Sequence, residues 1–139
     1  DTDGHIDTLA RFCQEDTIAY VQCLNKKDEH YRELQLMEKE LQAFRQPNGR
    51  PYRLVPLPMA NKYVWKAKRI PATYANFLIM NTAVLVPFYD SPKDEIARKR
   101  LKAVFPGRQI IGINCRPLIK QHGSLHCVTM QYPKDVLRF

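Results

Sequence analysis

The chain has 139 residues, of which 45% are hydrophobic and 26% charged, and its formal net charge is +8. These values are typical of a folded domain and argue against disorder. No apolar run approaches the roughly 20 residues of a membrane-spanning helix. The first residues also lack the basic and apolar segments of a signal peptide. We therefore expect a cytoplasmic protein with no membrane partner.

The positive charge is scattered along the chain. The basic residues of segment 98–102 lie on a predicted helix that also carries apolar residues, which is typical of a solvated helix face. Segment 61–70, "NKYVWKAKRI", does interleave aromatic and basic side chains. No recognition motif accompanies it, so nucleic acid is not an expected partner.

The four cysteines are widely spaced and form no CxxC motif. Cys13, Cys23 and Cys115 lie in apolar runs, which predicts small buried side chains. Reduced thiols agree with a cytoplasmic location.

The first part of the chain predicts the order strand, strand, helix, strand. Residues 9–24 predict two strands around a turn at Glu15 and Asp16. Residues 28–46 predict a helix with Asp28 as its N-cap, and residues 52–58 predict a further strand. Segment 62–73 is expected to be a loop.

The same order then recurs. Residues 73–89 predict a strand pair, and residues 91–105 predict a helix with Ser91 as N-cap and Pro92 at the first helical position. A short buried strand at 108–115, a single helical turn at 116–121 and a last strand at 124–132 follow.

This recurrence is an internal repeat. At an offset of 65 residues, Phe12 aligns with Phe77, Thr17 with Thr82 and Val21 with Val86. Two such units and a terminal strand predict an α/β (α+β) array of modules rather than one doubly wound sheet. Repeat units bury their flanks against neighbours, so the chain is expected to be about half of a larger array. The start without a methionine also predicts a piece of a longer product.

Cys127 is a candidate nucleophile. It follows the tight turn of Gly123 and Ser124, which places it at a strand end near the rim of a sheet. Neighbouring strand residues point to opposite faces, so His126 is not expected to be its base. A buried structural cysteine is the alternative.

His5 and Asp7 of "DGHIDT" are the candidate partners of Cys127. On a strand, residues two apart share a face, so an imidazole and a carboxylate would project together. Histidine beside a cysteine suits nucleophilic catalysis with proton transfer in both directions. A surface turn is the alternative for this pair.

His5, Asp7, His122 and His126 are residue types that can bind a metal. The spacing of His122 and His126 brings two ligands together on a helix, but Gly123 and Ser124 between them oppose a helix. No metal is predicted.

The segments "DTDGHIDT", "RIPATYANFLIMNTAVLVPFYDSPKDE", "FPGRQIIGINCRPLI" and "GSLHCVTMQYP" together resemble the C-terminal half of the agmatine deiminase family, which includes the porphyromonad-type peptidylarginine deiminases. The resemblance covers essentially the whole chain. It implies a partial pentein, an α/β propeller of ββαβ modules around a central channel. Residues 1–139 would be the C-terminal half of one catalytic domain, with modules at about 1–60 and 70–115 and a terminal strand at 124–132.

The resemblance also implies a hydrolase that needs neither metal nor cofactor. Cys127 would attack a guanidinium carbon, His5 would transfer protons, and Asp7 and Asn76 would bind the substrate. Agmatine would give N-carbamoylputrescine and ammonia, a step of putrescine biosynthesis. The alternatives are a peptidylarginine deiminase that makes protein citrulline and a non-catalytic pentein-like binding module.

Two departures from the family qualify this expectation. The family's remaining acidic site residues come from the N-terminal half of the domain, so that half is an expected partner and residues 1–139 alone are expected to turn over little substrate. Exposed module edges would favour a homo-oligomer. The segment before Cys127 reads "QHGSLHC" where plant-type members carry "GGGNIHC", which leaves agmatine and peptidyl-arginine both open.

Overall fold

The computed structural model describes residues 4–132 and residue 136. Its first unit contains β1 (Ala10–Gln14), β2 (Thr17–Gln22), α1 (Tyr31–Ala43) and β3 (Arg53–Pro58). The sheet order is β1-β2-β3, in which β1 is antiparallel and β3 parallel to β2. A parallel neighbour requires a crossover, and α1 provides it.

The second unit repeats this topology. It contains β6 (Leu78–Ile79), β7 (Ala83–Phe88), α2 (Pro92–Val104) and β8 (Gln109–Asn114). Again the first strand is antiparallel and the third is parallel to the central one. The repeat predicted from the sequence is therefore confirmed, as is the mixed α/β class.

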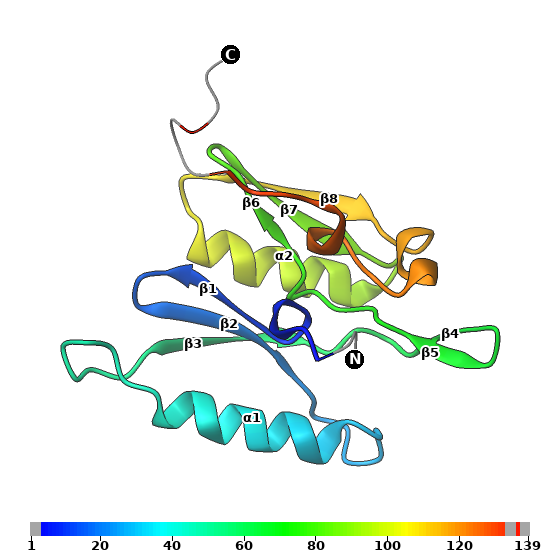
Figure 1. Cartoon of the computed structure of the whole chain (residues 1–139), viewed down its shortest axis with the longest axis horizontal. Helices are drawn as coiled ribbons and strands as arrows, with labels where there is room; N and C mark the ends of the chain where they lie inside the picture. The colour runs from blue at the N-terminus through cyan, green and yellow to red at the C-terminus, as the bar shows by residue number, and fades with distance from the viewer. Residues whose placement is uncertain (1–3, 133–135, 137–139) are drawn as a thin grey trace.

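The two units share one hydrophobic core. Helix α2 packs against β7 and β8 of its own unit and also against β3 of the first unit (Figure 1). At this second contact Lys93 Nζ donates a hydrogen bond to Met59 O at 2.8 Å, and the Arg100 guanidinium donates to Pro56 O. The main cluster of buried side chains runs through both units and includes Val21, Leu57, Val84, Val86 and Leu101. A smaller cluster lies between α1 and the first sheet.

The starts of the two helices differ from each other. Ser91 caps α2 as predicted, with Pro92 at the first position, and Asp94 completes a capping box. The predicted N-cap of α1 is wrong, because the helix begins at Tyr31 after His30. Asp28 instead accepts a hydrogen bond from His30 N at 3.0 Å, which forms a turn ahead of the helix.

The segment predicted to be a loop contains a β-hairpin instead. Strands β4 (Tyr63–Trp65) and β5 (Lys68–Ile70) pair antiparallel around Lys66 and Ala67. Both turn residues have positive φ, 48° and 61°. Asparagine and glycine normally occupy such turns, so the sequence carries no hairpin signal here.

The predicted terminal strand at 124–132 is also wrong. Residues His126–Val128 form a 3-10 helix, η3, and no strand is found in the described part of this segment. The amides of His126 and Cys127 point to the side chain of Asn76 rather than to a neighbouring strand. A 3-10 helix, η2 (Leu118–Gln121), precedes it where a helical turn was predicted.

Strand β8 is less buried than predicted. It lies at the edge of its sheet, and the side chains of Ile111 and Ile113 are 39% and 37% exposed. Neither α1 nor α2 is long and apolar enough to cross a membrane, and the described residues contain no other α-helix.

Candidate active site

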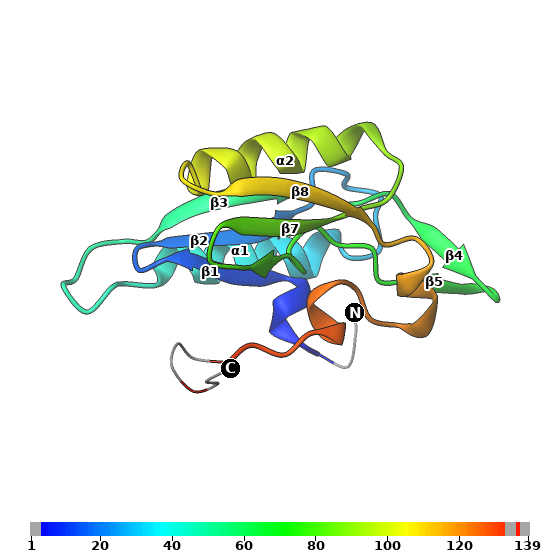
Figure 2. The ribbon, with the colours of Figure 1, turned by 90° about the horizontal axis from the view of Figure 1, so that it is seen from above.

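Two short 3-10 helices from opposite ends of the chain meet at one edge of the molecule (Figure 2). The first, η1 (Ile6–Thr8), carries Asp7, and the second, η3, carries His126 and Cys127. Asp7 Oδ2 lies 2.7 Å from His126 Nδ1 and 4.0 Å from the Cys127 sulfur. The predicted convergence of the first and last segments is therefore present, although neither segment is a strand.

Asn76 lies at the centre of this cluster and is completely buried. Its Oδ1 accepts hydrogen bonds from His126 N at 2.9 Å and Cys127 N at 3.4 Å, and it lies 3.4 Å from the Cys127 sulfur. Its Nδ2 donates to Asp7 Oδ2 at 3.0 Å and to Asp7 O at 3.2 Å. The amide thus holds the carboxylate and the thiol in fixed relative positions.

A chain of buried hydrogen bonds fixes the two 3-10 helices from behind. The Ser124 hydroxyl bonds the Tyr89 hydroxyl at 2.8 Å, and Tyr89 in turn donates to Thr73 O at 3.0 Å. Thr73 Oγ1 then donates to Thr8 O, next to Asp7, at 2.6 Å. Burial raises the pKa of the Tyr89 hydroxyl, which keeps it a hydrogen-bond donor.

The glycine before this segment has a steric role. A Cβ atom at Gly123 would lie 3.1 Å from Cβ of Cys127, which is tighter than normal packing. The turn of Gly123 and Ser124 predicted from the sequence is therefore also a close approach of the backbone to the thiol.

Arg11 is a nearby cation that sequence reasoning missed. Its guanidinium lies 5.2 Å from the centre of the Phe77 ring, and its Nη1 donates to Phe77 O at 2.9 Å. Burial lowers the pKa of this group, while the charges of Asp7 and Cys127 act in the opposite direction. The signal in the sequence was a basic residue inside the first of the two strands predicted within residues 9–24.

His5 is placed differently from the prediction. It precedes η1 rather than sharing a strand face with Asp7, and its side chain is exposed. Its carbonyl accepts a hydrogen bond from Thr8 Oγ1 at 2.8 Å, whereas its ring makes no hydrogen bond within residues 4–132. The imidazole that does contact Asp7 is that of His126, which the expected strand geometry had set aside.

The remaining cysteines fit the prediction more closely. Cys23 and Cys115 are buried, Cys13 is half-buried, and Cys127 is exposed. Burial raises the pKa of Cys13 to about 11 and also raises that of Cys115. Within residues 4–132 and 136, no three His, Cys, Asp or Glu side chains gather as a metal-binding group.

Comparison with known proteins places the whole chain in a family. Residues 1–133 match the family model described as Porphyromonas-type peptidyl-arginine deiminase. The chain belongs to this family. The resemblance seen in the sequence is thereby confirmed.

The relatives of this chain are named either agmatine deiminase or arginine deiminase. A "Putative agmatine deiminase" of Lactococcus lactis is 31% identical over 151 residues, covering 96% of this chain and 41% of that protein. A solved "Putative Arginine Deiminase" from Porphyromonas gingivalis is 62% identical with a TM-score of 0.93, covering 96% of this chain and 39% of that one. An agmatine deiminase of C. jejuni, solved as a serine-for-cysteine variant with substrate bound, is 45% identical with a TM-score of 0.82, covering 91% and 36%. The chain therefore spans about 40% of the length of these relatives.

Proposed function

We propose that this chain supplies the catalytic thiol of a guanidine deiminase, a hydrolase that converts agmatine to N-carbamoylputrescine and ammonia. The observation that carries the proposal is the joint position of Asp7, Asn76 and Cys127. A carboxylate and a thiol lie 4.0 Å apart, with one buried amide holding both. A planar guanidinium bound to Asp7 would present its carbon to the sulfur.

The proposed reaction has two stages. The Cys127 thiolate forms a bond to the guanidinium carbon, and the carbon–nitrogen bond to ammonia breaks as the nitrogen takes up a proton. Water then attacks the resulting covalent intermediate, the carbon–sulfur bond breaks, and the ureido product leaves. Hydrolysis consumes one water and releases one ammonia, with no change in oxidation state.

We assign proton transfer to His5, as the family resemblance implies. Its exposed ring is free of hydrogen bonds to residues 4–132, so it can turn toward a bound substrate. Asp7 contributes a charge-assisted contact to the guanidinium N–H groups. Asn76 orients Asp7 and Cys127 by hydrogen bonds, so its contribution to substrate binding is indirect. No metal or cofactor takes part in this proposal.

Peptidyl-arginine is the second candidate substrate. The matching family model describes peptidyl-arginine deiminases. In both cases we propose that residues 1–139 form the C-terminal half of a pentein catalytic domain, which the N-terminal half must complete. Little turnover is expected from residues 1–139 alone.

The test measures ammonia and ureido product from agmatine and from an arginine-containing peptide, using the full-length protein. Cys127→Ser should lower turnover by at least about a thousandfold, because it removes the nucleophile. Cys13→Ser is the matched control and should retain activity. Turnover by Cys127→Ser at the level of the unsubstituted protein would refute the proposal, and the preferred substrate decides between agmatine and peptidyl-arginine.

A further inference from the structure

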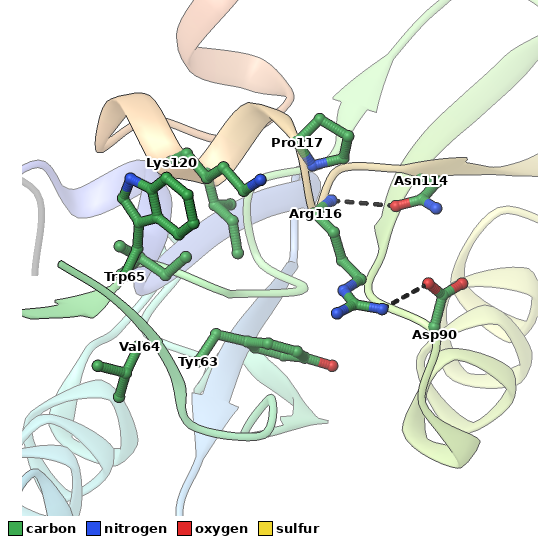
Figure 3. A pocket seen from close by; sticks show the side chains of 10 residues that line it. Tyr63, Val64, Trp65, Asp90, Asn114, Arg116, Pro117 and Lys120 are labelled. Carbon is green, nitrogen blue, oxygen red and sulfur yellow. Dashed lines mark hydrogen bonds and ion pairs between the residues drawn. The ribbon is translucent and has the colours of Figure 1, made fainter. Parts of the chain in front are cut away.

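A recess of about 420 Å³ opens between the hairpin β4–β5 and the segment 114–120 (Figure 3). Its volume lies within the roughly 300–1,000 Å³ of sites that bind small molecules. None of Asp7, Asn76, His126 and Cys127 lines it. It is therefore separate from the cluster around the proposed nucleophile.

The floor and one wall of the recess are apolar. Ile70 and Ile119 are buried and form part of the floor, whereas Val64 and Trp65 are 56% and 43% exposed. Exposed aromatic and aliphatic side chains in a concave site offer a surface for a flat ring or a compact apolar body.

The rim of the recess carries an excess of positive charge. The Lys120 ammonium lies 4.4 Å from the centre of the Trp65 ring, and no carboxylate in the described part of the chain forms an ion pair with it. Arg116 lies over the Tyr63 ring, but Asp90 already neutralises it at 3.0 Å (Figure 3). Lys120 is thus the cation of the rim that can form an ion pair with an anionic group of a ligand, next to the apolar wall.

The hairpin that carries Tyr63 and Trp65 has a strained turn. Lys66 and Ala67 both adopt the left-handed backbone region that favours glycine. This turn places Tyr63 and Trp65, two residues apart on one strand face, against the segment that carries Arg116 and Lys120. The two cation–aromatic contacts therefore hold the strained turn and form one side of the recess.

We propose that this recess binds a small carboxylate that carries a flat ring or a compact apolar body. The ring packs against Trp65, and the carboxylate pairs with the Lys120 ammonium. A cationic ligand is disfavoured, because Lys120 and Arg116 outnumber the single carboxylate of Asp90 among the lining residues. This site does not depend on the hydrolysis proposed at Cys127.

Trp65 makes the test direct, because it is the single tryptophan of the chain. Its fluorescence is followed while the chain is titrated with phenylacetate, phenylacetamide and phenethylamine, which share a ring and differ in charge. Phenylacetate should give a saturable change. Phenylacetamide should bind about fivefold more weakly, the factor expected for one exposed ion pair.

Two variants separate charge from shape. Lys120→Met should bind phenylacetate no better than phenylacetamide, and Lys120→Arg should retain the preference. Lys99→Met, on the exposed side of α2, is the matched control and should leave all three titrations unchanged.

Three results would overturn the proposal. Equal affinity for phenylacetate and phenylacetamide would show that the recess does not select charge. Tighter binding of phenethylamine would show that the recess prefers a cationic ligand to an anionic one. If no probe gave saturable binding, the recess would not be a ligand site. The two cation–aromatic contacts would then only stabilise the packing of the hairpin against segment 114–120.

Discussion

At the scale of single residues, Cys127 differs from the other three cysteines in its surroundings. It is exposed, whereas burial raises the pKa of Cys13 to about 11 and also raises the pKa of Cys115. A thiol reacts with iodoacetamide as the thiolate, so a raised pKa leaves a thiol protonated and unreactive at neutral pH. We expect limiting iodoacetamide to label Cys127 first at pH 7, with Cys13 labelled only as the pH approaches 11.

Peptide mass spectrometry after brief labelling checks this expectation. Cys127→Ser should lose the fast label entirely, and the other three sites should be unaffected. Labelling of Cys13 at the rate of Cys127 at neutral pH would contradict it.

His126 is the residue whose role the structure changes most. Its Nδ1 lies 2.7 Å from Asp7 Oδ2, so it orients the carboxylate that is proposed to bind substrate. His126→Ala should raise the KM of the full-length protein about tenfold or more, the cost of a hydrogen bond to a charged group, and should lower kcat less. His126→Asn retains a donor near the position of Nδ1 and should recover most of the affinity.

His122→Asn is the control for this series. His122 lies four residues away in the left-handed region, which asparagine tolerates. A loss in kcat alone for His126→Ala, without rescue by asparagine, would show that His126 does not position Asp7.

The residues of the candidate site were largely predictable, but their geometry was not. Asp7, Asn76 and Cys127 follow from residue type and family resemblance, and the structure brings them together. His126 was set aside because a strand would turn it away from Cys127. The segment instead bonds to the Asn76 side chain, which is 50 residues away in the sequence, and no local pattern reveals such a contact.

At the scale of elements, periodicity predicted both helices and both strand–strand–helix–strand units. Both helices and the central strands β2 and β7 are strongly patterned, and each buries a face in the core. The hairpin β4–β5 escaped prediction because its turn uses Lys66 and Ala67. Tertiary contacts to Arg116 and Lys120 hold it in place of turn chemistry.

This turn gives a prediction about stability. Replacing Lys66 with Asn and Ala67 with Gly should stabilise the chain by about 1 kcal/mol, because both positions lose the energetic penalty of a positive φ. Glycine also increases the conformational entropy of the unfolded state, which offsets part of this stabilisation. Denaturant unfolding should show a higher midpoint with an unchanged m-value.

Gly49 provides the converse control. Its φ is +80° and no atom lies within 4 Å of the position of an added Cβ, so Gly49→Ala tests backbone strain without a steric clash. It should destabilise by about 1 kcal/mol. An unchanged midpoint for the Asn–Gly turn, together with a loss at Gly49→Ala, would show that the hairpin turn relaxes in solution.

At the scale of the whole molecule, the repeat defines which surfaces are partnered. Helix α2 packs against its own sheet and also against β3 of the first unit. Strand β8 occupies the place of β3 in the second unit, yet its Ile111 and Ile113 side chains are 39% and 37% exposed. We infer that the full-length protein covers β8 with a further helix, as α2 covers β3. This chain covers only about 40% of the length of its relatives, so a protein of their length has further residues that can form such a helix.

Ile113→Glu, measured in two contexts, tests this inference. In the 139-residue chain the side chain is partly in water, so the change should alter the free energy of unfolding by no more than about 0.5 kcal/mol. In the full-length protein the same carboxylate would be buried under the covering helix without a partner, and the cost should be at least about 2 kcal/mol. Ile96→Glu, on the exposed side of α2, is the matched control, because both neighbours of α2 are already present and its 42% exposure should persist in either context. Equal effects of Ile113→Glu in the two proteins would mean that β8 remains an open edge, and the same edge would then favour self-association.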